Sequence, residues 1–235
     1  GSAVGGNLSA TAITGDITDS TYLNITGTSS FTTNANNAKI TLDNSNNAFT
    51  GSISLNTTGP LAHAVVDNGT TALDIAASNI GGDLSLISGN ASGITDSGTV
   101  TVGGNLLATT DANSGVINLG TLAVDGTVKL TTNGSGNATV VNDAGLNFAA
   151  STVGGALNAT ATTGNMTDSG ALTITGTTTL TTSANNATIA LDTTTNAFTG
   201  AVTITTNDDS GTDADVTIDG GTTAFILAAS TIDGD

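Results

Sequence analysis

The chain has 235 residues and a formal net charge of −17, and all 19 of its acidic residues are Asp. It contains no Cys, Glu, Gln, Arg or Trp, so it has no thiol chemistry, no disulfide framework and few strong helix formers. So acidic a surface repels nucleic acid and anionic lipid, which we therefore exclude as expected partners. No run approaches the ~18 apolar residues of a membrane span, so we expect no insertion into a membrane.

Composition and periodicity together predict a folded, all-β chain. Hydrophobic residues make up 37% of the sequence, and they alternate with polar residues, as in strands that bury one face. Thr, Val and Ile favour a pleated, half-buried surface. A disordered chain would combine high charge with low hydrophobicity, and this one does not.

In chain order, one unit occurs about three times. After Gly1-Ser2, which matches the remnant of a cleaved tag, the segment Val-Gly-Gly-Asn-Leu at 4–8 returns as Ile-Gly-Gly-Asp-Leu at 80–84 and Val-Gly-Gly-Ala-Leu at 153–157. We therefore divide a single domain, 3–235, into units 4–79, 80–152 and 153–231, with a fourth beginning at 232. The units are 73–79 residues long.

Apolar pairs two residues apart hold their place in every unit, and each unit closes on Ala-Ala-Ser. Such pairs predict short strands with one buried face, separated by Gly-, Asn- and Asp-rich turns. The pairs are Leu23/Ile25, Val100/Val102 and Leu172/Ile174, then Ile40/Leu42, Ile117/Leu119 and Ile189/Leu191, then Ile53/Leu55, Val128/Leu130 and Val202/Ile204.

Two architectures can hold this pattern: an antiparallel sandwich array and a parallel β-solenoid. A sandwich of this size usually buries Trp or Tyr, and the chain has no Trp and one Tyr. Small and medium side chains suit the shallow turns of a solenoid, where equivalent residues stack on one another. We therefore predict a β-solenoid with three turns per unit, or alternatively four.

The segments 151–157, 167–180 and 196–204, such as Asn-Ala-Phe-Thr-Gly-Ala-Val-Thr-Ile, resemble the repeat regions of filamentous-haemagglutinin-type exoproteins. The resemblance covers residues 3–235. It implies a right-handed parallel β-helix that is secreted through an outer membrane and displayed as a surface fibre, so that the protein would be extracellular or at a bacterial cell surface. That family's N-terminal secretion domain has no counterpart in this segment.

The sequence predicts no catalytic, cofactor-binding or metal-binding residue and therefore no enzyme. β-Helix hydrolases and lyases use Arg, Lys or paired acids, whereas Lys39 and Lys129 are far apart in sequence and stand where other units have hydroxyls. His63 is the only histidine, and we expect it in an exposed loop, without the partners that a catalytic or metal site requires. The Thr-Asp-Ser motifs at Asp19, Asp96 and Asp168 predict turns capped by their own side chains.

These observations favour a structural or adhesive segment of a secreted bacterial fibre, acting as a rigid stalk or a scaffold for cell contact. Its expected partners are a glycan or protein on a host or neighbouring cell, and further copies that associate end to end. The alternative is a ligand-binding solenoid for Ca²⁺, glycan or ice. It would use the acidic loop 207–219, which holds Asp208, Asp209, Asp213, Asp215 and Asp219, or the Thr-rich faces.

Overall fold

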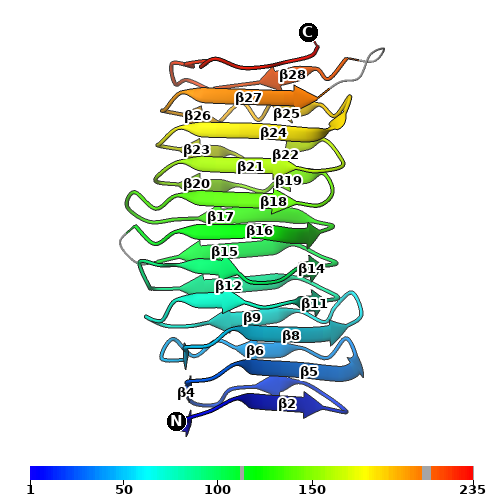
Figure 1. Ribbon diagram of the computed structural model, residues 1–235, viewed down its shortest axis with the longest axis vertical. Coiled ribbons are helices and arrows are strands. Elements are labelled where there is room, and N and C mark those ends of the chain that lie inside the picture. Colours follow the sequence, from blue (N-terminus) through cyan, green and yellow to red (C-terminus); the bar gives the residue numbers. More distant parts are fainter. Residues whose placement is uncertain (112–113, 208–212, 235) are drawn as a thin grey trace.

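The computed structural model describes residues 1–111, 114–207 and 213–234, and within them the chain winds into a single parallel β-solenoid of about nine turns. The turns stack in one column whose two ends hold the N-terminus and the C-terminus (Figure 1). Strands are joined in three parallel sheets, and the described residues contain no helix. The predicted fold class is thus confirmed, and no described segment forms a helix that could cross a membrane.

The smallest sheet lies at the N-terminal end and has three strands. These are β1 (Ser2–Val4), β4 (Leu23–Ile25) and β7 (Ala48–Phe49).

The second sheet has 12 strands and runs through the column. These are β2 (Leu8–Ala12), β5 (Ser29–Asn36), β8 (Ile53–Thr58), β10 (Leu73–Ile75), β11 (Ser78–Ile80), β13 (Ile94–Asp96), β14 (Val100–Val102), β16 (Ile117–Val124), β18 (Ala138–Asn142), β21 (Leu157–Ala161), β24 (Thr178–Asn185) and β27 (Val202–Asn207).

The third sheet has 13 strands and also runs through the column. These are β3 (Ile17–Thr18), β6 (Ile40–Leu42), β9 (Ala64–Asp67), β12 (Leu84–Ser88), β15 (Leu106–Thr110), β17 (Thr127–Thr131), β19 (Leu146–Phe148), β20 (Ser151–Val153), β22 (Met166–Asp168), β23 (Leu172–Ile174), β25 (Ile189–Leu191), β26 (Ala197–Phe198) and β28 (Val216–Ile218).

Every turn contributes its alternate, inward-facing side chains to one continuous apolar core. In β12, for example, Leu84 and Leu86 are buried while Ser85 and Ile87 are partly exposed. The apolar pairs that recur in the sequence face this core, and nearly all of them are fully buried. Inside it the rings of Phe31 and Phe49 meet edge to face at 5.9 Å.

One turn takes fewer residues than a third of a unit. Paired residues on successive turns are 19 positions apart for Ala138 and Leu157 and 22 positions apart for Leu106 and Val128. The first two units therefore each hold a further short strand, which is β10 in the first unit and β19 in the second. About nine turns carry the three units, so the prediction of three turns per unit holds approximately, and each unit runs slightly past its third turn.

The additional strand moves each unit sideways around the column. Strand β8 pairs with β10 through Ile53 and Ile75 and with β11 through Asn56 and Asn79. As a result β12, the counterpart of β2, stacks on β9 in the 13-stranded sheet, although β2 lies in the 12-stranded sheet. Equivalent residues of successive units are therefore not superposed along the column.

Candidate functional site

The Asp residues of the Thr-Asp-Ser motifs cap backbone groups of the following turn. Asp19 accepts hydrogen bonds from the N–H groups of Asp43 and Asn44, both at 3.3 Å, and from Asn47 Nδ2 at 2.6 Å. Asp168 makes the matching three bonds in the third unit, and Asp96 accepts three from Gly120 and Thr121. The motif thus joins adjacent turns, whereas the sequence predicted a cap within its own turn.

A buried Thr within or directly after many of the longer strands closes the turn that follows. Its hydroxyl donates to a backbone carbonyl four or five residues ahead, at distances of 2.8–3.1 Å. The donors and acceptors are Thr33 and Ala38, Thr57 and Ala62, Thr110 and Gly115, Thr132 and Gly136, and Thr182 and Ala187. These hydroxyls are therefore structural and do not face a ligand.

Asn68 and Asn142 are buried side chains that replace a missing strand pairing. Asn68 accepts from the N–H of Phe49 at 2.7 Å and donates to the carbonyls of Phe49 at 3.1 Å and Ala72 at 2.8 Å. Asn142 does the same for Val124 and Gly145, at 2.8, 3.0 and 2.7 Å. Each amide satisfies three backbone groups where the additional strand of the unit begins.

The Ala-Ala-Ser motifs mark the junctions between units. In the first, Ser78 Oγ accepts from the N–H of Leu55 at 3.0 Å and donates to the carbonyl of Ala76 at 2.8 Å. Ser151 and Ser230 repeat both bonds at the later junctions. The polar residues that recur with the unit are thus occupied in holding adjacent turns together.

The two lysines are exposed on the 13-stranded sheet, as the sequence predicted for outward positions. Lys129 pairs across the strands with Leu107. Lys39 immediately precedes Ile40, which pairs with Ala64. No carboxylate lies within 4.0 Å of either ammonium group in the part of the chain that the structure describes.

His63 is not the freely exposed loop residue that the sequence suggested. It leads into β9, and its Nδ1 accepts from the N–H of Asp83 at 2.9 Å and lies 3.3 Å from the Asp83 carboxylate. Ser85 lines the same hollow as this pair, so Ser, His and Asp converge here. In neutral His63 the acceptor role of Nδ1 puts the proton on Nε2, so Nε2 cannot take a proton from Ser85 as a triad requires.

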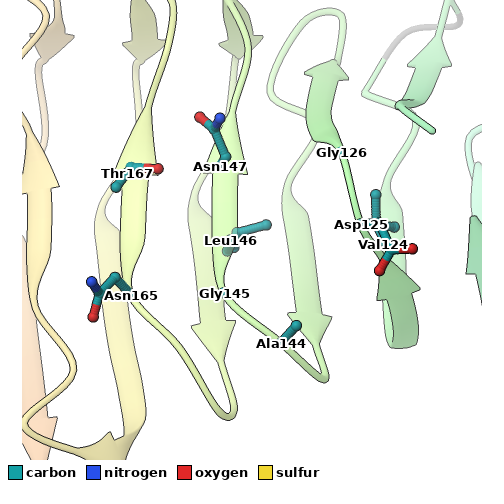
Figure 2. Close-up of a pocket in the computed structure, with 9 residues that line it drawn as sticks. All are labelled: Val124, Asp125, Gly126, Ala144, Gly145, Leu146, Asn147, Asn165 and Thr167. Atoms are coloured by element: carbon teal, nitrogen blue, oxygen red, sulfur yellow. The ribbon is translucent and has the colours of Figure 1, made fainter. Parts of the chain in front are cut away.

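An open hollow of about 340 Å³ lies where the connection between β16 and β17 adjoins β19 and β22, and Figure 2 shows the residues that line it. Its polar side chains are Asp125, Asn147, Asn165 and Thr167, which come from successive turns. Asn165 Oδ1 is occupied by the N–H of Thr188 at 2.9 Å, while Asn147 Oδ1 is buried without a hydrogen-bond partner. The hollow presents acceptor oxygens but no nucleophile beside a base, and so it supports no reaction step.

The acidic loop contributes little to a site among the described residues. Asp208 and Asp209 lie outside them, Asp213 and Asp215 are exposed, and Asp219 accepts from the N–H of Gly221 at 2.7 Å. Within the described ranges, no three His, Cys, Asp or Glu side chains gather as they would around a metal ion. A calcium site in this loop therefore stays a sequence prediction.

Outward threonines stack on only a few turns. Thr160, Thr181 and Thr205 are paired across β21, β24 and β27, but the next residue of this row, on β18, is Val141. The parallel row contains Thr203 and Thr179 and then Asn158. A longer row on the 13-stranded sheet contains Thr109, Thr131, Thr152 and Thr173, but its next members are Ile87 and Ala197. A surface that orders water needs its motif on every turn, and here the regular part covers at most four turns.

Fold and repeats together define the class of protein: a parallel β-solenoid built from tandem units. The chain belongs to the family described as repeats of unknown function, DUF5649, whose model matches residues 1–56, 62–119 and 135–205. No curated protein and no solved structure matches the chain significantly.

Proposed function

We propose that this solenoid is a rigid spacer in a bacterial surface fibre, which holds other parts of the fibre away from the cell or takes part in cell contact. The observation that carries the proposal is the use of the recurrent polar residues. Asp19, Asn68, Ser78 and their counterparts each make at least one hydrogen bond to the adjacent turn. The polar residues that recur from unit to unit are therefore residues whose hydrogen bonds hold adjacent turns of the column together.

The parallel column supports a mechanical role for a further reason. Each turn pairs with the turns on both sides through backbone hydrogen bonds, and the apolar core is continuous along the column. Bending such a column strains many hydrogen bonds at once, so the column keeps a fixed length and direction, which a flexible linker does not. The resemblance to filamentous-haemagglutinin repeats agrees with this role and with a place at the cell surface.

Antibody labelling tests the location, and sedimentation tests the shape. An antibody raised against the 1–235 polypeptide should label intact producing cells, and protease added outside them should remove the signal. Analytical ultracentrifugation should give a frictional ratio above that of a compact protein of 22.6 kDa. Signal only after lysis, together with a compact shape, would contradict the proposal.

We also propose that copies of the polypeptide associate end to end. Phe225, Ile226 and Leu227, at the C-terminal end of the column, are 40%, 53% and 54% exposed. Strand β28 of the third unit is the counterpart of β9 in the first unit, and β9 pairs with β12, the first long strand of the second unit. Strand β2 of a second copy, which is the counterpart of β12, would therefore pair with the free edge of β28 in the same way. Sedimentation at rising concentration should show association of the unaltered polypeptide. Leu227→Asp should abolish this association, and Asn158→Asp, on the side of the column, should preserve it. Equal behaviour of the two variants would refute end-to-end association.

A further inference from the structure

Asn is followed directly by Gly at two places in the sequence, Asn68-Gly69 and Asn133-Gly134. This dipeptide is prone to spontaneous ring closure, in which the backbone nitrogen of the glycine attacks the carboxamide of the asparagine. Glycine favours the attack because it has no side chain to shield its nitrogen. Ring closure also needs a carboxamide that is free to react and a nitrogen close to it, so the structure decides which of the two sites can react.

Both dipeptides occupy the first two positions of a tight turn. The backbone carbonyl of each Asn accepts from the N–H three residues ahead, at 3.0 Å for Asn68 and 3.2 Å for Asn133. Gly69 and Gly134 both have positive φ angles, 53° and 62°, which glycine adopts readily. The two turns are therefore alike in backbone, and they differ in what holds the Asn side chain.

The carboxamide of Asn68 is locked in place. It is fully buried and holds the N–H and carbonyl of Phe49 and the carbonyl of Ala72. The N–H of Gly69 is directed elsewhere, since it donates to Oδ1 of Asp67 at 2.9 Å. Ring closure at Asn68 requires these bonds to break first, so it is confined to the small population of locally opened molecules.

The carboxamide of Asn133 is held far less firmly. Asn133 and Gly134 are exposed, and Asn133 Nδ2 donates to the carbonyl of Asp111 at 3.4 Å, which is long for a hydrogen bond. The N–H of Gly134 donates to Oδ1 of Asn133 itself at 2.7 Å. The attacking nitrogen therefore lies beside the carboxamide that it attacks, and both groups are open to water.

We propose that Asn133 is a site of self-modification, at which the folded chain converts its own carboxamide into aspartate and isoaspartate. The backbone nitrogen of Gly134 gives its proton to hydroxide, and its electron pair forms a bond to Cγ of Asn133. The bond between Cγ and Nδ2 breaks, and Nδ2 takes a proton from water and leaves as ammonia. Water then opens the succinimide ring. Cleavage of the new bond at Cγ gives aspartate, whereas cleavage at the former backbone carbonyl gives isoaspartate.

The isoaspartate product alters the turn that carries it. Its main chain runs through Cβ and Cγ, so the connection between β17 and β18 becomes one atom longer. The carbonyl of Asn133 accepts from the N–H of Ser114 on the preceding turn at 3.1 Å, and in isoaspartate this oxygen belongs to a free carboxylate outside the main chain. Modified molecules should therefore open more easily at this turn. The modification does not depend on the role as a spacer.

Peptide mapping by mass spectrometry tests the proposal on the 1–235 polypeptide incubated at neutral and at mildly alkaline pH. Folded protein is compared with protein kept unfolded in urea, and isoaspartate is measured separately by methylation of its free carboxylate with an isoaspartyl methyltransferase. Asn133→Thr is the matched variant. Thr58 precedes Gly59 at the equivalent place in the first unit, so this variant should fold, as circular dichroism would verify.

In the folded protein Asn133 should convert at least about a hundredfold faster than Asn68, which reacts only after local opening. The rate at Asn133 should rise in proportion to hydroxide concentration, because the attacking nitrogen must lose its proton. In urea the two sites should convert at similar rates. Asn133→Thr should remove most of the isoaspartate that the folded protein forms, and after incubation it should melt at a higher temperature than the unaltered protein treated alike.

Two results would overturn the assignment of Asn133. One is conversion of Asn68 and Asn133 at equal rates in the folded protein, since the fold would then not select between them. The other is an Asn133 that stays intact in the folded protein while it reacts in urea, since the turn would then protect it. Equal melting temperatures of the incubated unaltered protein and Asn133→Thr would overturn the weakening of the turn.

Discussion

Replacing Asn68 with Ala should be among the most damaging single changes on the polar side of this fold. The Asn68 side chain is fully buried and satisfies the N–H and carbonyl of Phe49 and the carbonyl of Ala72. Each buried backbone group left without a partner costs about 1–3 kcal/mol. Because water can enter part of the space vacated, we expect a total loss of about 3–5 kcal/mol in the free energy of unfolding, a large share of the ~5–15 kcal/mol typical of a domain.

Urea denaturation followed by circular dichroism measures this loss. The midpoint should fall without a change in slope, since the surface exposed on unfolding stays nearly the same. Asn142→Ala offers an internal replicate, because Asn142 makes the same three bonds with Val124 and Gly145. Asn158→Ala is the matched control, since Asn158 is exposed, and its effect should stay within about 0.5 kcal/mol.

The reasoning would be refuted if Asn68→Ala and Asn142→Ala cost no more than Asn158→Ala. It would also fail if the two buried sites differed widely, because their hydrogen bonds are nearly identical in length.

Three further changes test other parts of the structure. His63→Asn should change the free energy of unfolding by less than about 0.5 kcal/mol, because Asn137 accepts from the equivalent N–H in the second unit. His63→Leu removes the acceptor and should cost about 1 kcal/mol. Equal melting temperatures for the two variants would contradict this capping role. Ser78→Ala leaves the N–H of Leu55 unpaired and should cost about 1–3 kcal/mol in urea denaturation, and a silent change would show that the junction does not need its hydroxyl. Burial, assisted by nearby carboxylates, raises the pKa of Asp67 above 3.8. The folded state then binds this proton more tightly than the unfolded state, so its ionisation destabilises the fold at pH 7 and the penalty disappears as the pH falls through the raised pKa towards 3.8. Asp67→Asn should therefore raise the melting temperature at pH 7 and have little effect near pH 3. A lower melting temperature of this variant at pH 7 would contradict the prediction.

The sequence was sufficient to predict the fold because the repeat and the strand period point to the same answer. Pairs such as Ile40 and Leu42 are apolar in every unit, and both are buried here. The part-turn by which each unit exceeds three turns was not predictable in the same way, because the strand that adds it, β10, is short and follows directly on the turn at Asn68. Its distinguishing signal is that buried Asn, which in an Asn-rich chain does not stand out.

The surface features were harder to predict than the core. His63 lies in a segment where the units diverge, and its bond to Asp83 depends on which strands become neighbours. Val65, Ile87 and Leu107, which face outward, likewise come from two units, and they lie close together only because β12 stacks on β9 and β15 on β12. Their closeness cannot be seen in the sequence without the register of these strands.

The central claim is that the chain is a straight column that grows by a fixed length with each unit. Small-angle scattering can test it by comparing the 1–235 polypeptide with one that carries a second copy of residues 80–152 inserted after residue 152. A unit of slightly more than three turns adds roughly 16 Å at about 4.8 Å per turn, so the maximum dimension should rise by that amount while the cross-sectional radius stays constant. A maximum dimension that stays the same while the cross-section widens would contradict the column and, with it, the role as a spacer.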